Sequence, residues 1–340
     1  MDFNKKISVC LPFYNIAPYV SRCLDSVLKN TYSNLEVICV NDGSTDGTAD
    51  LLHSYAEKDA RVTVIDKKNG GVVSARNAAI AAATGDFISF VDGDDWIHHQ
   101  FYEVLMSIQK KTDADVVICG YKKTGDYVND VEISADNVPF ETVAPRQILK
   151  DAHAVTHVWG RLYRRTLIPK KQVPSDIAMG EDTALNLLFL YGEKQTHVVA
   201  TPVLLYYYFQ REGSLVRTIP HAEKIKVSKF LAENYSLFSN SEEGSGIILE
   251  EILRTLLSYR YLEMFSPQKE DTQKVCKQLY TFCTNRWDGV IGITKRSQYR
   301  LLYHIPLLYR LYRITTDPSM MDWEQTERKR QRGRGQKQEK

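Results

Sequence analysis

The chain has 340 residues, 43% of them hydrophobic and 25% charged, values that are ordinary for a soluble globular protein with a sizeable core. No apolar run approaches the roughly 18 residues needed to cross a bilayer, which argues against a membrane-spanning helix. The net charge of +2 is uneven, since residues 328–340 carry +6 and the other 327 residues carry −4, which predicts a mildly acidic body with a basic, disordered tail.

The start of the chain and the cysteines bear on where the protein works. Residues 1–15 lack the long apolar segment of a signal peptide, so we expect the protein to stay in the cytoplasm. None of the six cysteines forms a Cys-x-x-Cys pair, which argues against zinc or thioredoxin chemistry. Cys10, Cys39 and Cys119 lie in apolar runs, and we expect the cysteines to be small buried side chains in a reducing compartment.

Strand-like and helix-like segments alternate in the first third of the chain. The predicted strands are residues 7–14, 35–42, 61–66, 86–92 and 114–120. The predicted helices are residues 17–30, 46–59 and 71–84, with Asp46 as the expected N-cap of the second. Nearly continuous apolar strands that alternate with helices predict a mostly parallel sheet covered by helices on both faces.

The pattern loosens after residue 120. Residues 121–156 are typical of short strands and loops, and residues 180–192 predict a helix. Residues 196–214 predict two strands broken by Pro202, because proline cannot donate a hydrogen bond to a neighbouring strand.

The chain becomes helical after Pro220. The predicted helices there are residues 221–238, 246–265 and 271–287. From these changes in character we expect a first domain over residues 1–217, a helical C-terminal region over residues 218–315, and the basic tail over residues 316–340.

Residues 299–314 are rich in Leu and Tyr, with arginines between them. This composition fits a helix that packs on the first domain, and it also fits an interfacial helix at a membrane surface. The basic tail behind it would add attraction to anionic lipid. Nucleic acid is a competing partner for such a tail, but no RNA-binding motif or basic, aromatic platform accompanies it, so we expect no nucleic-acid binding.

Three aspartates, Asp92, Asp94 and Asp95, follow the predicted strand at 86–92. Polar residues also follow two other strands, at 12–15 and 41–47, and ligands of open α/β sheets bind at such strand ends. Each segment alone could be a simple turn with solvated side chains or a helix cap. The coincidence of all three favours one binding crevice.

The spacing in Asp92-Gly93-Asp94 favours a hard divalent ion. In an extended segment both carboxylates lie on one face, and Gly93 between them would let the backbone turn closely against a ligand. Mg²⁺ or Mn²⁺ suits oxygen ligands, and phosphate oxygens would complete the coordination. The chain contains no P-loop motif, and no GxGxxG follows the first strand, which argues against P-loop NTPases and dinucleotide binding.

Four motifs resemble, in order and spacing, those of the inverting family-2 glycosyltransferases. They are SVCLPFYN, VNDGSTDGT, NGGVVSARNAAIAAATGDFISFVDGDDW and GEDTALN, and the resemblance covers roughly residues 6–217. It implies an α/β GT-A fold, in which a Rossmann-like, mostly parallel sheet is flanked by helices, followed here by the helical C-terminal region.

The resemblance also implies roles for individual residues. The nucleotide-sugar site would comprise Pro12, Tyr14, Asn15, Asp42, Asn69, Gly70, Arg76, Asp92 and Gly93. Asp94 and Asp92 would hold Mn²⁺ or Mg²⁺, and Asp182 would be the general base. Arg211 and Ser214 could reach the diphosphate, although a strand end with a solvated arginine is an equal alternative. Asn41 stands where the family often has an acid.

Taken together, the sequence predicts a cytoplasmic, membrane-peripheral, metal-dependent glycosyltransferase. It would move a sugar from a UDP-sugar to a hydroxyl of a surface glycan or lipid-linked glycan, with Asp182 as the base that inversion requires. From the residues alone, Glu181 and Asp182 could simply begin a helix, where the macrodipole favours acids. Two further alternatives are a nucleotidyltransferase, which would need a basic, glycine-rich loop after the first strand, and an inactive UDP-sugar-binding protein.

Overall fold

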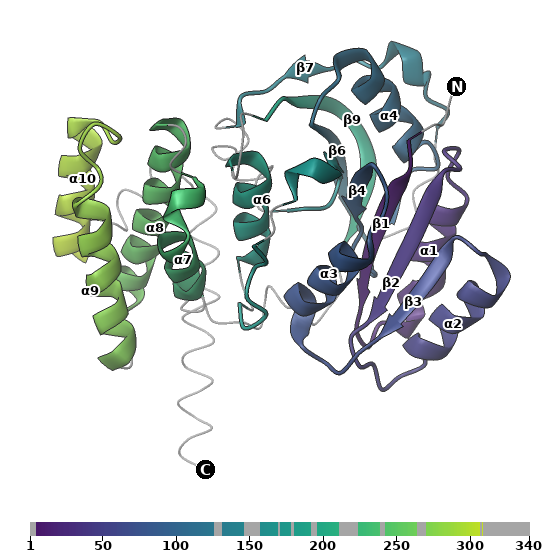
Figure 1. The fold of residues 1–340 in the computed structure, drawn as a ribbon, viewed down its shortest axis with the longest axis horizontal. Helices are drawn as coiled ribbons and strands as arrows, with labels where there is room; N and C mark the ends of the chain where they lie inside the picture. Colours follow the sequence, from purple (N-terminus) through teal and green to yellow (C-terminus); the bar gives the residue numbers. More distant parts are fainter. Residues whose placement is uncertain are drawn as a thin grey trace. The chain divides into compact units, whose positions relative to one another are not determined.

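A computed structural model defines the fold. It describes residues 5–125, 131–145, 157–168, 171–177, 180–191, 196–210, 224–238, 242–263, 270–306 and 308. The chain divides into two compact units, residues 1–244 and 245–340, which are treated separately below (Figure 1).

The first unit is built on one mixed sheet. Its strands are β1 (Ile7–Phe13), β2 (Leu35–Asn41), β3 (Val62–Asp66), β4 (Phe87–Phe90), β5 (Trp96–Ile97), β6 (Val116–Thr124), β7 (Glu141–Thr142), β8 (Arg161–Arg164) and β9 (Val198–Phe209). They lie in the order β3-β2-β1-β4-β8-β6-β9-β5, with β7 against β9. Strands β1 to β4 pair in parallel, whereas β8 runs antiparallel to both β4 and β6. The predicted, mostly parallel α/β sheet is confirmed.

Helices cover both faces of strands β1 to β3. The helices of this unit are α1 (Ala17–Leu28), α2 (Thr48–Lys58), α3 (Gly71–Ala82), α4 (Phe101–Thr112), α6 (Glu181–Tyr191) and α7 (Lys224–Glu233). Figure 1 shows α1 and α2 on one side of these strands and α3 on the other. Helix α1 buries Val20, Cys23, Leu24 and Val27, a spacing that places all four on one face.

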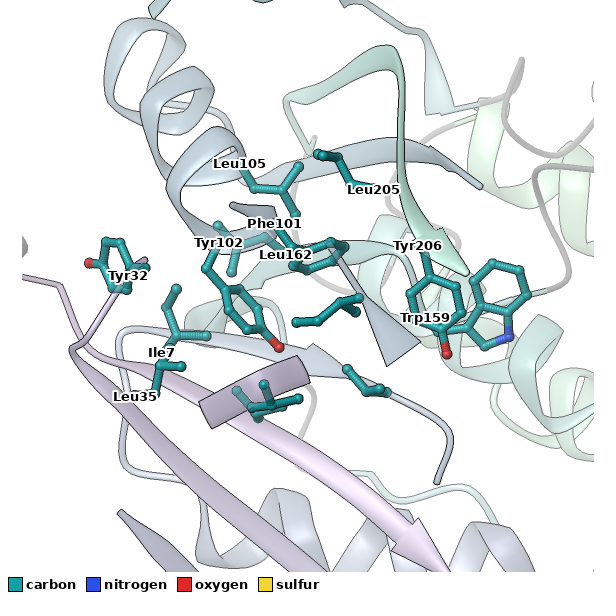
Figure 2. Close-up of a cluster of buried hydrophobic side chains, with 14 of the residues drawn as sticks. Ile7, Tyr32, Leu35, Phe101, Tyr102, Leu105, Trp159, Leu162, Leu205 and Tyr206 are labelled. Atoms are coloured by element: carbon teal, nitrogen blue, oxygen red, sulfur yellow. The ribbon is translucent and has the colours of Figure 1, made fainter. Parts of the chain in front are cut away.

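The core lies between the sheet and the helices α1 and α4. Figure 2 shows Phe101, Tyr102 and Leu105 of α4 against strand residues such as Ile7 and Leu162. All six cysteines are free and buried, as the sequence predicts.

Two local predictions are wrong. The N-cap of α2 is Gly47 and not Asp46, whose carboxylate instead accepts hydrogen bonds from the Thr48 and Ala17 backbone N–H groups at 3.0 and 3.1 Å. Pro202 does not break the chain into two strands, because β9 continues through it. The register with β6 shifts next to Gly120, so an irregularity in the sheet accommodates the proline without ending the strand.

The second unit consists of helices in the described residues. Most of α8 (Glu242–Glu263), α9 (Glu270–Thr284) and α10 (Ile293–His304) belong to it. Trp287 is 1% exposed, and the rings of Tyr280 and Tyr303 stack at 3.7 Å. In the part of the chain that is described, no helix has the length and apolar character needed to traverse a bilayer.

The expected domain division stays a prediction. Helix α7 belongs to the first compact unit, which extends to residue 244. Residue 217 and the tail from residue 316 onward lie outside the described residues.

Candidate active site

The loops after β1 and β2 are bonded to each other. Asn15 has a left-handed backbone with φ of 49°, which asparagine tolerates better than most residues. Its side-chain oxygen accepts a hydrogen bond from the Thr45 N–H at 2.8 Å, and its own N–H donates to the Ser44 hydroxyl at 3.1 Å. Tyr14 beside it is 49% exposed, and Pro12 is paired with Val40 within the sheet. The structure therefore brings the first two predicted loops together.

Asp42 closes the N-terminus of α3. Its carboxylate is 3% exposed and accepts hydrogen bonds from the Gly70 and Gly71 N–H groups at 3.0 and 2.8 Å. Lys67 adds an ion pair at 2.5 Å. Helix N-termini favour negative charge, so Asp42 fixes the loop of residues 67–71 at the end of β2. Asn69 lies in this loop, with its backbone nitrogen against Gly43.

Arg76 joins three carboxylates from two separate segments, the loop after β4 and the start of α6. Nη2 donates to Asp92 at 2.9 Å, while Nη1 donates to Glu181 at 3.3 Å and to Asp182 at 2.5 Å. Arg76 itself is only 3% exposed. Burial alone would lower the pKa of Arg76, but the three carboxylates outweigh it and raise the pKa, so the guanidinium stays charged. We call Arg76, Asp92, Glu181 and Asp182 the arginine cluster.

Asp182 has the properties of a proton acceptor. Burial raises the pKa of Asp182 to about 8; Arg76 acts in the opposite direction, and Glu181 and Asp92 raise it further. A carboxyl group that titrates near neutral pH is suited to general base catalysis. Arg76 holds Oδ1, while Oδ2 lies 4.0 Å from Nδ1 of His157.

The three aspartates after β4 occupy different environments. Asp95 is fully buried and accepts hydrogen bonds from the Tyr206 hydroxyl at 2.6 Å and the Phe209 N–H at 2.8 Å. Burial, with Asp92 and Asp94 nearby, raises the pKa of Asp95. Asp94 is half-buried, and its backbone carbonyl accepts a hydrogen bond from Arg22 at 2.8 Å. Asp95 is therefore a structural anchor, whereas Asp92 and Asp94 are only half-buried.

Gly93 is required by packing. A Cβ atom there would lie 2.6 Å from ring and side-chain carbons of Phe13 and Ile16. The sequence suggested that the backbone at Gly93 lies close to a ligand. In the structure it lies close to Phe13, the last residue of β1, and to Ile16, the N-cap of α1.

The carboxylates of Asp92 and Asp94 fit a divalent cation whose other ligands are phosphate oxygens of a substrate. Among the described residues, no three His, Cys, Asp or Glu side chains are grouped so as to hold a metal ion. Asp92 and Asp94 offer only carboxylate oxygens, and Mg²⁺ is commonly held by one or two carboxylates together with substrate phosphates. The residues fit a divalent ion shared with a diphosphate.

Several site residues escaped the sequence analysis. Arg22 and Tyr206 donate hydrogen bonds to residues 92–95, which we call the acidic loop. His157 lies beside Asp182, and Trp159 lies beside Tyr206. The one signal in the sequence was the third acid, Asp95, directly before Trp96. Three neighbouring carboxylates rarely share one ion, so a third acid indicates a separate partner, which in the structure is Tyr206. Arg211 and Ser214 lie outside the described residues.

Comparison with known proteins places this chain among glycosyltransferases. Residues 8–170 match the family model described as glycosyl transferase family 2. EpsJ of Bacillus subtilis (strain 168), an uncharacterized glycosyltransferase, is 38% identical over 189 residues, which cover 53% of this chain and 55% of EpsJ. Glycosyltransferase GlyA of Streptococcus pneumoniae serotype 4 is 33% identical over 253 residues, or 71% of this chain and 36% of GlyA. The matches thus span about half or less of these two relatives.

The fold has a close counterpart among solved structures. Residues 1–349 of S. aureus TarS, in complex with UDP-GlcNAc, superpose with a TM-score of 0.69 at 22% identity, covering 93% of this chain and 92% of that chain. The likeness confirms the GT-A type of fold.

Replacing Arg76 tests the arginine cluster. Arg76→Met should destabilise the protein by about 3–5 kcal/mol at pH 8, because three carboxylates lose their shared cation. Arg76 lowers the pKa of Asp182, so removing Arg76 raises that pKa further above about 8, and the loss of stability grows as the pH rises past 8. Urea unfolding at pH 6 and pH 9.5 measures this. Arg76→Lys, which keeps the charge, should lose less, and a loss that is equal at both pH values would contradict the cluster.

Proposed function

The chain belongs to glycosyl transferase family 2, and from that premise we propose that it transfers a sugar from a UDP-sugar to an acceptor hydroxyl of a surface glycan, with inversion at the anomeric carbon. The observation that carries the proposal is the arginine cluster. In this cluster the Arg76 guanidinium donates hydrogen bonds both to Asp182, whose pKa is about 8, and to Asp92 of the acidic loop. The UDP-GlcNAc bound by TarS supports a UDP-sugar as donor.

In this proposal the inner face of the crevice binds the donor. Asn15, Asp42 and the loop of residues 67–71 form a wall at the ends of β1 and β2, where a nucleoside fits. Tyr14, which is 49% exposed beside Asn15, would offer its ring to the base. Such preformed polar groups at strand ends are typical of nucleotide sites in open α/β sheets.

Asp182 would take the proton of the attacking hydroxyl. Arg76 holds its Oδ1, which leaves Oδ2 to meet the acceptor on the side of His157. Attack opposite the leaving UDP needs one base and no covalent enzyme intermediate, so one well-placed carboxylate is sufficient.

Asp94 and Asp92 would hold the divalent cation, Mn²⁺ or Mg²⁺, which offsets the negative charge that develops on the leaving diphosphate. Arg22 fixes the position of Asp94 through its backbone carbonyl. The rings of Trp96 and Phe209 lie against the Arg22 guanidinium, at 4.1 and 4.3 Å, so this support is itself rigid.

Of the alternatives, family membership argues against a nucleotidyltransferase. An inactive UDP-sugar-binding protein is separated from an active enzyme by one assay, the release of UDP from a panel of UDP-sugars with and without Mn²⁺. Active turnover with one donor supports the proposal, and donor binding without any release of UDP would favour the inactive protein.

We further propose peripheral contact with the inner face of an anionic membrane. In the second unit, Ile293 and Leu301 of α10 are 73 and 50% exposed, and Ile305, directly after α10, is 46% exposed. Tyr299 and Leu302 of the same helix are buried. This exposed apolar side precedes the tail whose residues 328–340 carry +6. Apolar insertion and charge attraction together anchor peripheral proteins.

Asp182→Asn tests the base. The amide keeps the shape of the side chain but cannot accept a proton, so transfer should fall by about 10²-fold or more. UDP affinity, measured by calorimetry, should stay within a few-fold. A large loss of UDP affinity with a modest loss of turnover would instead make Asp182 a binding residue.

Asp94→Ala tests the metal site. Removal of one carboxylate should abolish Mn²⁺-dependent UDP release and weaken the binding of Mn²⁺ to the UDP complex, which can be followed by electron paramagnetic resonance. The matched control is Asp50→Ala, an exposed acid in the first turn of α2, which should behave as wild type. Normal Mn²⁺ binding by a folded Asp94→Ala protein would refute the assignment.

Deleting residues 316–340 tests the membrane contact. The truncated protein should keep its activity on soluble substrates but sediment less with anionic vesicles. Because the tail acts through charge, the difference from the full chain should shrink in ~0.5 M salt, where screening is strong. If neither form sediments at low salt, the membrane proposal fails.

A further inference from the structure

Five aromatic rings form a wall beside the arginine cluster. Trp159 lies at its centre, and its ring stacks on His157 at 4.2 Å, on Tyr206 at 4.4 Å and on Tyr208 at 5.5 Å. Tyr121 meets Trp159 edge-on at 5.0 Å. We call these five residues the aromatic wall. Figure 2 shows its buried base, Trp159 against Tyr206, which are 4% and 0% exposed.

The sheet register explains why the wall has one face. Strands β6 and β9 pair so that Tyr121 lies opposite Tyr206, and Lys123 lies opposite Tyr208. Side chains two residues apart point to the same side of a sheet, so all four share a face. Tyr121, His157 and Tyr208 are half-buried, which leaves ring surface at the solvent side of the wall.

The wall begins at the oxygen of Asp182 that faces away from Arg76. Nδ1 of His157 lies 4.0 Å from that oxygen, Oδ2. The carbonyl of His157 accepts a hydrogen bond at 3.0 Å from Asn186, which lies one turn after Asp182 on α6, so the two side chains are held in fixed relation. Burial lowers the pKa of His157 to about 4, so the imidazole is neutral and can both donate and accept hydrogen bonds.

We infer that the aromatic wall is the acceptor subsite, and that the acceptor therefore ends in a sugar ring. The inference rests on the proposed function and extends it to the acceptor. One apolar face of a pyranose would lie on the half-buried rings of Tyr208 and Tyr121. Its hydroxyls would meet His157, a positioning residue, with the attacking hydroxyl at Oδ2 of Asp182. A mostly aromatic surface with a few convergent polar groups is the usual composition of such a site.

Binding to the UDP-saturated protein tests the inference. The probes are the methyl glycosides of glucose, galactose and N-acetylglucosamine, and glycerol 3-phosphate as a polyol without a ring. Saturation-transfer NMR reports which probe protons contact the protein, and calorimetry reports UDP affinity separately. We expect the ring protons of at least one glycoside to be saturated more strongly than the carbon-bound protons of glycerol 3-phosphate.

Variants of the wall identify where the glycoside binds. Tyr208→Ala and His157→Ala should each weaken glycoside binding by about five-fold or more, the scale of one aromatic contact. Tyr208→Phe keeps the ring and should stay within two-fold of wild type. Lys122→Ala is the matched control, because Lys122 is exposed and lies on the opposite face of β6. All four should bind UDP as wild type does.

The possible failures are distinguishable. If the wild-type protein does not bind UDP, the proposed function fails together with the inference. If it binds UDP but no methyl glycoside, or prefers glycerol 3-phosphate, only the inference is overturned. Unchanged glycoside binding by both Tyr208→Ala and His157→Ala would likewise overturn it, and weaker UDP binding by these variants would place the wall in the donor site.

Discussion

One buried guanidinium holds the catalytic half of this molecule together. Arg76 on α3 pairs with Asp92 after β4, 16 residues along the chain, and with Glu181 and Asp182 at the start of α6, 105 and 106 residues along the chain. With three carboxylates around one cation the cluster keeps excess negative charge, so burial is tolerated only if one group binds a proton or a second cation arrives. The raised pKa of Asp182 follows from this imbalance, and the proposed divalent cation at the acidic loop would reduce it.

The pairing with Arg76 also determines how the carboxyl groups of the arginine cluster are oriented. Arg76 occupies one oxygen of Asp182 and one of Asp92, so each carboxyl group presents its other oxygen elsewhere. For Asp182 that direction is toward His157, whose neighbouring rings extend away from the cluster. The two oxygens of Asp182 therefore meet different partners, Arg76 and His157, and in the proposed function Oδ2 would face the acceptor.

The sequence predicts what is local and periodic. The first four strands and the three helices between them follow from apolar spacing, and the polar strand ends at Asn15, Asp42 and Asp92 follow from the rule for parallel sheets. Non-local pairing is not encoded in any window, so the antiparallel place of β8 and the continuous β9 through Pro202 were not predictable. The same limit hid Trp159, which only the sheet brings onto Tyr206.

The role of Asp95 shows how burial separates identical residues. Asp92, Asp94 and Asp95 are indistinguishable as letters, yet Asp95 alone turns inward to the Tyr206 hydroxyl and the Phe209 N–H. The same Tyr206 hydroxyl accepts a hydrogen bond from the Asp92 N–H at 3.2 Å, and its ring supports Trp159. The acidic loop and the aromatic wall thus share one anchor on β9. A change that loosened Tyr206 would disturb both at once, so the geometry of the proposed cation site depends on the same residue as the geometry of the wall.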